Sequence, residues 1–88
     1  MRVILTWDES KRIANLARHG LDFGSLSPEF FDESVVLPAK LGRYRAIGHA
    51  DGKRIVAVIF RPLGREALSI ISMRPASRKE REHAPQDA

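Results

Sequence analysis

The chain begins with a strand-like run and then changes to a helical repeat. Residues 2–6 are mostly β-branched or apolar, whereas Ile13, Leu16 and Ala17 in the segment that follows are three or four positions apart, the spacing of one helix face. Gly20 supplies a left-handed C-cap. The pattern therefore predicts a short strand, then an amphipathic helix whose apolar face packs against the core and whose polar face carries cations.

The middle of the chain predicts a second helix and then strands. Residues 21–31 have helical character, and Ser27 as N-cap with Pro28 at the first position is the best local start. Four strand-like stretches follow, SVVLPA, GRYRAIGHA, KRIVAVIFR and EALSIISMR. Asp51-Gly52 is the two-residue signal for a tight hairpin. KRIVAVIFR is apolar on both faces, which predicts a central strand covered on both sides.

A capping box of Ser77 and Glu80 begins a short last helix, SRKEREH. The predicted order is βααββββα. This order favours an α+β fold with an antiparallel sheet of four to five strands and helices packed on one face. We expect a single domain over residues 1–84 and a frayed tail over residues 85–88.

Composition narrows the function classes. The 88 residues contain no cysteine, which excludes disulfides and thiolate metal sites, and we expect no metal ion and no cofactor. No apolar run has the length of a membrane span, so a cytoplasmic location without membrane attachment is expected. The net charge of +4 favours a polyanion or an acidic protein as partner.

Motifs then suggest a family. In chain order they are Trp7-Asp8 with Lys11, Asn15 and His19-Gly20; Phe23 with the Phe-Phe-Asp that ends at Asp32; Arg43-Tyr44 with Ile47-Gly48; and Ile70-Ile71-Ser72-Met73-Arg74 with Ala76 and Glu80-Arg81. With these motifs in register, the chain resembles the BrnT family of toxins from type II toxin–antitoxin pairs, which have a RelE-like ribonuclease fold.

The resemblance implies an RNA endonuclease neutralised by a BrnA-like ribbon-helix-helix antitoxin, in a hetero-oligomer of expected 2:2 stoichiometry that reaches operator DNA through the antitoxin. Cleavage without metal uses the ribose 2′-hydroxyl as nucleophile and needs proton transfer and stabilisation of a dianionic phosphorane. Two other functions stay open. One is a non-catalytic toxin-like module in transcriptional autoregulation, and the other is a basic RNA-binding domain unrelated to toxicity.

Arg74 is the first candidate catalytic residue. It ends an apolar strand just before the last helix, a suitable place for a phosphate contact. The alternative is a structural ion pair with Glu80 or Glu82.

Arg43 and Arg61 are further catalytic candidates. A two-residue hairpin at Asp51-Gly52 places Arg43 opposite Phe60 and beside Arg61, so that an anion between the two arginines is one interpretation and an ordinary basic rim the other. The same register places Arg74 opposite Gly52, about 30 Å from Arg61 along the sheet.

Lys11 and His19 lie on the polar face of the first helix. The resemblance implies a catalytic or RNA-contacting role for both, whereas the plain alternative is a solvated face. Arg45, Arg54 and Arg78 are expected to extend a basic track for RNA. Tyr44 either stacks on a base or packs in the core.

Overall fold

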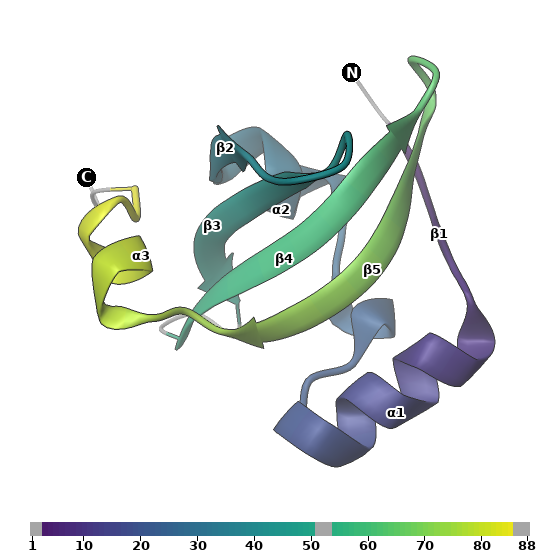
Figure 1. The fold of residues 1–88 in the computed structure, drawn as a ribbon, viewed down its shortest axis with the longest axis horizontal. Helices are drawn as coiled ribbons and strands as arrows, with labels where there is room; N and C mark the ends of the chain where they lie inside the picture. The colour runs from purple at the N-terminus through teal and green to yellow at the C-terminus, as the bar shows by residue number, and fades with distance from the viewer. Residues whose placement is uncertain (1–2, 51–53, 86–88) are drawn as a thin grey trace.

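The computed structural model describes residues 3–50 and 54–85. Its elements are β1 (Ile4–Trp7), α1 (Glu9–His19), the 3₁₀ turn η1 (Phe23–Ser25), α2 (Pro28–Glu33), β2 (Val35–Pro38), β3 (Tyr44–Ala50), β4 (Arg54–Leu63), β5 (Ala67–Pro75) and α3 (Arg78–Glu82). Apart from η1, this order is the predicted one (Figure 1). The predicted turn residues Asp51-Gly52, and the predicted tail from residue 86 onward, lie outside the described residues.

The five strands form a mixed sheet in the order β1-β5-β4-β3-β2. β1 runs parallel to β5, while the other neighbouring strands are antiparallel. The prediction of a wholly antiparallel sheet is therefore wrong. Hairpin signals describe strands that are adjacent in sequence, but β1 joins the last strand, and the chain crosses the sheet through α1, η1 and α2 before it reaches β2 at the opposite edge.

The apolar core covers one face of the sheet. The buried core side chains are Leu21, Phe23, Phe30, Ala46, Val56, Val58, Phe60, Ile70 and Met73. On β4, Val58 faces this core and Ala57 faces the other side, and both are fully buried, which confirms the central strand. α2 rests close on β3, since a Cβ on Gly48 would lie 3.0 Å from the Phe30 ring.

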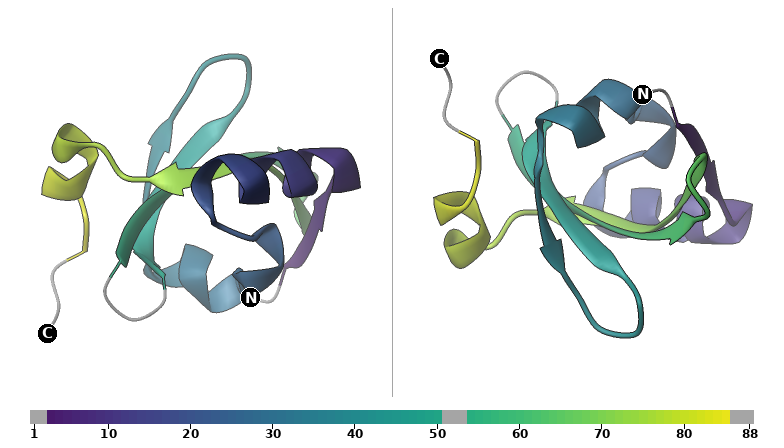
Figure 2. Two further views of the ribbon diagram at one scale, coloured as in Figure 1. Left: turned by 90° about the horizontal axis from the view of Figure 1, so that it is seen from below. Right: turned by 90° about the horizontal axis from the view of Figure 1, so that it is seen from above.

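The helices do not share one face, contrary to the prediction. η1 and α2 cover the core. α3 reaches the opposite face, where Glu80 accepts hydrogen bonds from Arg45 on β3 at 3.0 Å and from Arg74 on β5 at 2.6 Å. Figure 2 shows α3 set apart from α1 and α2, beyond the end of β5. Polar contacts, rather than an apolar stripe, hold α3 there.

α1 is oriented opposite to the prediction. Ile13 is 55% exposed and Leu16 39% exposed, whereas Asn15 is buried. The Asn15 side chain donates to the carbonyl of Met73 at 2.8 Å and accepts from its N–H at 3.0 Å. Because β1 pairs only with residues 67–70 of β5, the rest of that edge needs a polar partner, and the Asn15 amide supplies it.

The strand registers also differ from the prediction. Tyr44, not Arg43, pairs with Phe60, and Arg74 pairs with Ala57 rather than with Gly52. In β5 the register shifts by one residue, because Ser72 pairs with Ile59 and Ile70 with Phe60. Ile71 is thus the extra residue of a β-bulge.

Candidate active site

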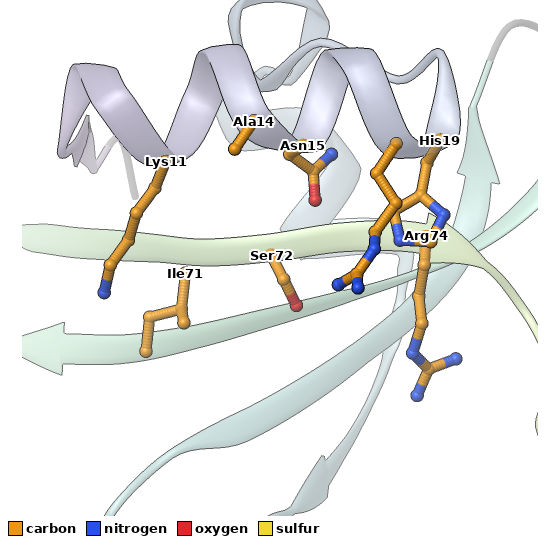
Figure 3. Close-up of a pocket in the computed structure, with 8 residues that line it drawn as sticks. Lys11, Ala14, Asn15, His19, Ile71, Ser72 and Arg74 are labelled. Carbon is orange, nitrogen blue, oxygen red and sulfur yellow. The ribbon is translucent and has the colours of Figure 1, made fainter.

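A pocket of about 370 Å³ lies between α1 and β5. Its lining residues are Lys11, Ala14, Asn15, Arg18, His19, Ile71, Ser72 and Arg74. Figure 3 shows Lys11 and Arg74 toward opposite ends of the pocket, with Ser72 between them. The sequence candidates Lys11, His19 and Arg74 therefore share one site.

The geometry of α1 directs its polar face into this pocket. The helix begins at an N-cap in which Asp8 accepts from the Ser10 N–H at 2.9 Å, and it ends at Gly20 with φ 69°. Between these caps, Asn15 also donates to the Leu21 carbonyl at 3.0 Å. Anchoring at the middle of the helix fixes Lys11 one turn before and His19 one turn after.

β5 supplies the other wall. Met73 faces the core, so strand alternation turns Ser72 and Arg74 to the opposite face. In a regular strand, residues three positions apart point to opposite faces. Ile70 and Met73 nevertheless both point into the core, because the extra residue of the bulge at Ile71 lies between them. Bulges are common beside active sites, where they change the direction of a side chain.

Arg74 is held by a carboxylate. It donates to Glu80 through both terminal nitrogens, at 2.6 and 2.9 Å, and Arg45 donates to the same group at 3.0 Å. Chiefly because of the hydrogen bond from Arg74, the pKa of Glu80 falls to about 2. In turn, this bond raises the pKa of Arg74. The structural ion pair considered from sequence is present, and 35% of the Arg74 side chain is still exposed at the pocket.

The basic side chains that α1 contributes to the pocket are not paired with a carboxylate in this way by any residue that the structure describes. Within residues 3–50 and 54–85, no ion pair is recorded for Lys11, Arg18 or His19. Arg12 on the same helix, by contrast, pairs with Glu9 at 2.6 Å and Asp22 at 3.1 Å. Among the residues that the structure describes, none with a carboxylate lines the pocket. An anion is the natural ligand for such a site, and an imidazole beside it can transfer a proton near neutral pH.

Arg43 and Arg61 lie on the same face of the sheet as Arg74 but do not line the pocket. The Tyr44–Phe60 pair places Arg43 opposite Arg61. Arg74 of β5 pairs with Ala57 of β4. Ala57 and Arg61 are four residues apart on β4, so Arg74 and Arg61 are separated by about 13 Å along the strand direction. The expected 30 Å was wrong because it followed from the wrong register.

The candidate RNA-binding residues are dispersed. Arg45 is bound to Glu80, and Arg78 is exposed at the start of α3. Tyr44 and Arg54 belong to the other face of the sheet, where the Tyr44 ring lies 5.9 Å from that of Phe60. None of these four lines the pocket.

Sequence reasoning did not name three polar pocket residues, Asn15, Arg18 and Ser72, as site candidates. Asn15 and Ser72 entered only as parts of the family motifs, and no site role was predicted for Arg18. For Ser72 the sequence held a usable indication, because a hydroxyl interrupts the apolar run Ile-Ile-Ser-Met two positions before Arg74, on the same face of a strand.

Two further findings concern the described part of the chain. No group of three or more His, Asp or Glu side chains there is placed to hold a metal ion. None of its helices combines the length and apolar character of a bilayer span.

Comparisons with known proteins identify the family. A search of curated proteins returned no match. The crystal structure of the Brucella abortus ribonuclease toxin BrnT is similar, with a TM-score of 0.81 and 54% identity over 86% of this chain and 99% of that one. Residues 7–80 match the family model described as "Ribonuclease toxin, BrnT, of type II toxin-antitoxin system". The chain therefore belongs to the BrnT family of ribonuclease toxins from type II toxin–antitoxin systems.

Proposed function

We propose that the chain is a metal-independent RNA endonuclease of RelE-like fold, and that the pocket between α1 and β5 is its active site. The observation that carries this proposal is the shared lining by Lys11, Arg18, His19 and Arg74, with no carboxylate among the lining residues. Such a donor set suits a phosphodiester and offers a divalent cation no oxygen-rich cage.

The ribose 2′-oxygen attacks phosphorus and the bond to the 5′-oxygen breaks, which leaves a 2′,3′-cyclic phosphate and a free 5′-hydroxyl. Charge grows on the non-bridging oxygens in the transition state, where Lys11, Arg18 and the exposed part of Arg74 stabilise it. His19 takes part in proton transfer: it either accepts the proton of the 2′-hydroxyl while water protonates the leaving 5′-oxygen, or it protonates the leaving oxygen while water accepts the 2′-proton.

Arg43 and Arg61 extend the basic surface beyond the pocket on the same face. A cationic track of this kind holds the phosphates on either side of the cleaved bond. In this proposal Arg45 and Arg78 contribute near α3. Tyr44 and Arg54, on the other face, contact only RNA that passes the sheet edge.

Membership of the family supports a proposal for the partner and the location. We propose a BrnA-like ribbon-helix-helix antitoxin in a 2:2 complex that binds operator DNA through the antitoxin, acting in the cytoplasm. The family supports an antitoxin in general. Light scattering of the co-purified pair measures the stoichiometry.

The test is cleavage of end-labelled RNA by purified protein in EDTA. We expect products with 2′,3′-cyclic phosphate ends, and rates reduced about 100-fold or more in Arg74→Ala and His19→Ala. Arg65→Ala, which removes an exposed arginine in the β4–β5 turn, is the matched control and should cleave normally. RNA that stays intact with the folded wild-type chain contradicts the proposal.

One observation favours a second candidate function. The Arg74 guanidinium is already committed to Glu80 by two hydrogen bonds, as expected for a purely structural residue. A non-catalytic module would bind the antitoxin tightly and leave RNA intact in the same assay.

A further inference from the structure

α1 exposes an apolar surface that the core does not use. We call it the outer stripe, and it consists of Ile13, Ala14, Leu16 and Ala17. At 100° per residue, Ile13 and Ala17 lie nearly opposite Asn15, with Leu16 on one flank of them and Ala14 on the other, beside the pocket, and all four are exposed. An amphipathic helix normally turns such a stripe toward its own core.

The stripe runs into the proposed active site. Ala14 is exposed on the helix and also lines the pocket, so that apolar surface and cationic pocket are continuous. Lys11 and Arg18 border the stripe on that side. A ligand seated on the stripe would therefore meet Lys11 and Arg18 along one flank, two cations that form no ion pair with any described residue, and it would lie across the mouth of the pocket.

Apolar residues three and four apart on a helix form a ridge that packs well against another helix. The flanking cations select acidic residues at the edge of that second helix. A second copy of this chain fits less well, because an antiparallel pair of stripes would bring Lys11 and Arg18 of the two copies to the same flank. Like charges there repel.

We propose that the outer stripe is the docking site for an amphipathic helix of the antitoxin, with acidic residues of that helix over Lys11 and Arg18. The proposal rests on membership of a toxin–antitoxin family. It deepens the proposed function, since the bound helix blocks the pocket by its position and RNA and antitoxin compete.

The experiment measures the affinity of the full-length toxin for its cognate antitoxin, labelled with a fluorophore, together with RNA cleavage by the free toxin. Leu16→Glu and Ala17→Glu each introduce a carboxylate into the apolar outer stripe. Ala17→Glu keeps a strong helix former at an exposed position and should fold normally. The matched control is Val36→Glu, at a 45% exposed apolar position on β2, the opposite edge of the sheet.

We expect both stripe variants to bind at least tenfold more weakly and the control to stay within about twofold. All three should cleave RNA at the wild-type rate. Wild-type affinity in Ala17→Glu and Leu16→Glu overturns the proposal, because the antitoxin then docks elsewhere. A free wild-type dimer that Ala17→Glu converts to monomer overturns it too, in favour of a second copy.

Failure of the two proposals is separable. Loss of affinity in the stripe variants, with RNA left intact by the wild-type chain, supports the docking site and rejects the nuclease. Normal RNA cleavage by the wild-type chain, with unchanged antitoxin affinity in the stripe variants, supports the nuclease and rejects the docking site.

Discussion

α1 and α2 are both amphipathic, but they meet the sheet with opposite sides. α2 turns Phe30 into the core and exposes Glu29, Asp32 and Glu33. α1 turns Asn15 toward β5 and exposes Ile13. Burial of apolar side chains holds α2 on the sheet, whereas hydrogen bonds to an open strand edge hold α1. The difference shows that a periodic apolar stripe predicts a helix without predicting which side faces inward.

The largest effect should come from the apolar helix. Phe30→Ala removes a buried ring from the contact between α2 and β3, and we expect it to lower the free energy of unfolding by about 4 kcal/mol. Urea denaturation followed by circular dichroism measures this. Glu29→Ala, an exposed change on the same helix, should stay near wild type.

Asn15→Ala tests whether the polar anchor of α1 contributes almost as much to stability as the buried Phe30 ring of α2. It leaves the N–H and carbonyl of Met73 and the carbonyl of Leu21 without their partner, and a loss of about 3 kcal/mol in unfolding free energy is expected. The same denaturation assay applies, with Arg18→Ala as control. A loss no larger than that of the control would mean that α1 is held by something else.

α3 is a third case, held by charge. Since the pKa of Glu80 is lowered from 4.5 to about 2, its stabilising contribution is complete above pH 4.5 and is lost as the pH falls toward 2. We expect Glu80→Gln to cost about 2 kcal/mol at pH 7 and to flatten the pH dependence of unfolding between pH 4.5 and 2. A variant with an unchanged slope in that window would contradict the assignment.

The smallest effect should come from the exposed side of α1. Ile13→Ser removes apolar surface that is already 55% exposed, so the unfolding free energy of the isolated chain should change by about 0.5 kcal/mol or less. Thermal unfolding measures this. A loss comparable to that of Phe30→Ala would show that Ile13 belongs to the core.

Local chemistry was predictable because it depends on nearby residues. Gly20, Ser27 with Pro28, and the Ser77–Glu80 box end or begin helices where expected. Their hydrogen bonds and backbone angles are determined within a few positions of the chain.

Other features depend on residues far away in the sequence. The side of α1 that faces inward is set by Met73, 58 positions after Asn15. The predicted pairing of Arg43 with Phe60 assumed a two-residue turn between the strands. The actual register differs by one residue, because Tyr44 pairs with Phe60. The site itself was partly predictable, since the family motifs contain Lys11, His19, Ser72 and Arg74. That the two β5 residues share one pocket with the two α1 residues follows only from the fold.

The bulge at Ile71 lies where the neighbour of β5 changes. Before it, residues 67–70 pair with β1, and Leu68 and Ile70 point inward; after it, Met73 points inward and Asn15 of α1 is the neighbour. The extra residue therefore divides β5 into two halves, and the alternation of inward and outward side chains starts anew in the second half. A substitution at position 72 can therefore change the pocket wall while the half beside β1 keeps its own pattern, whereas position 74 is also tied to α3 through Glu80.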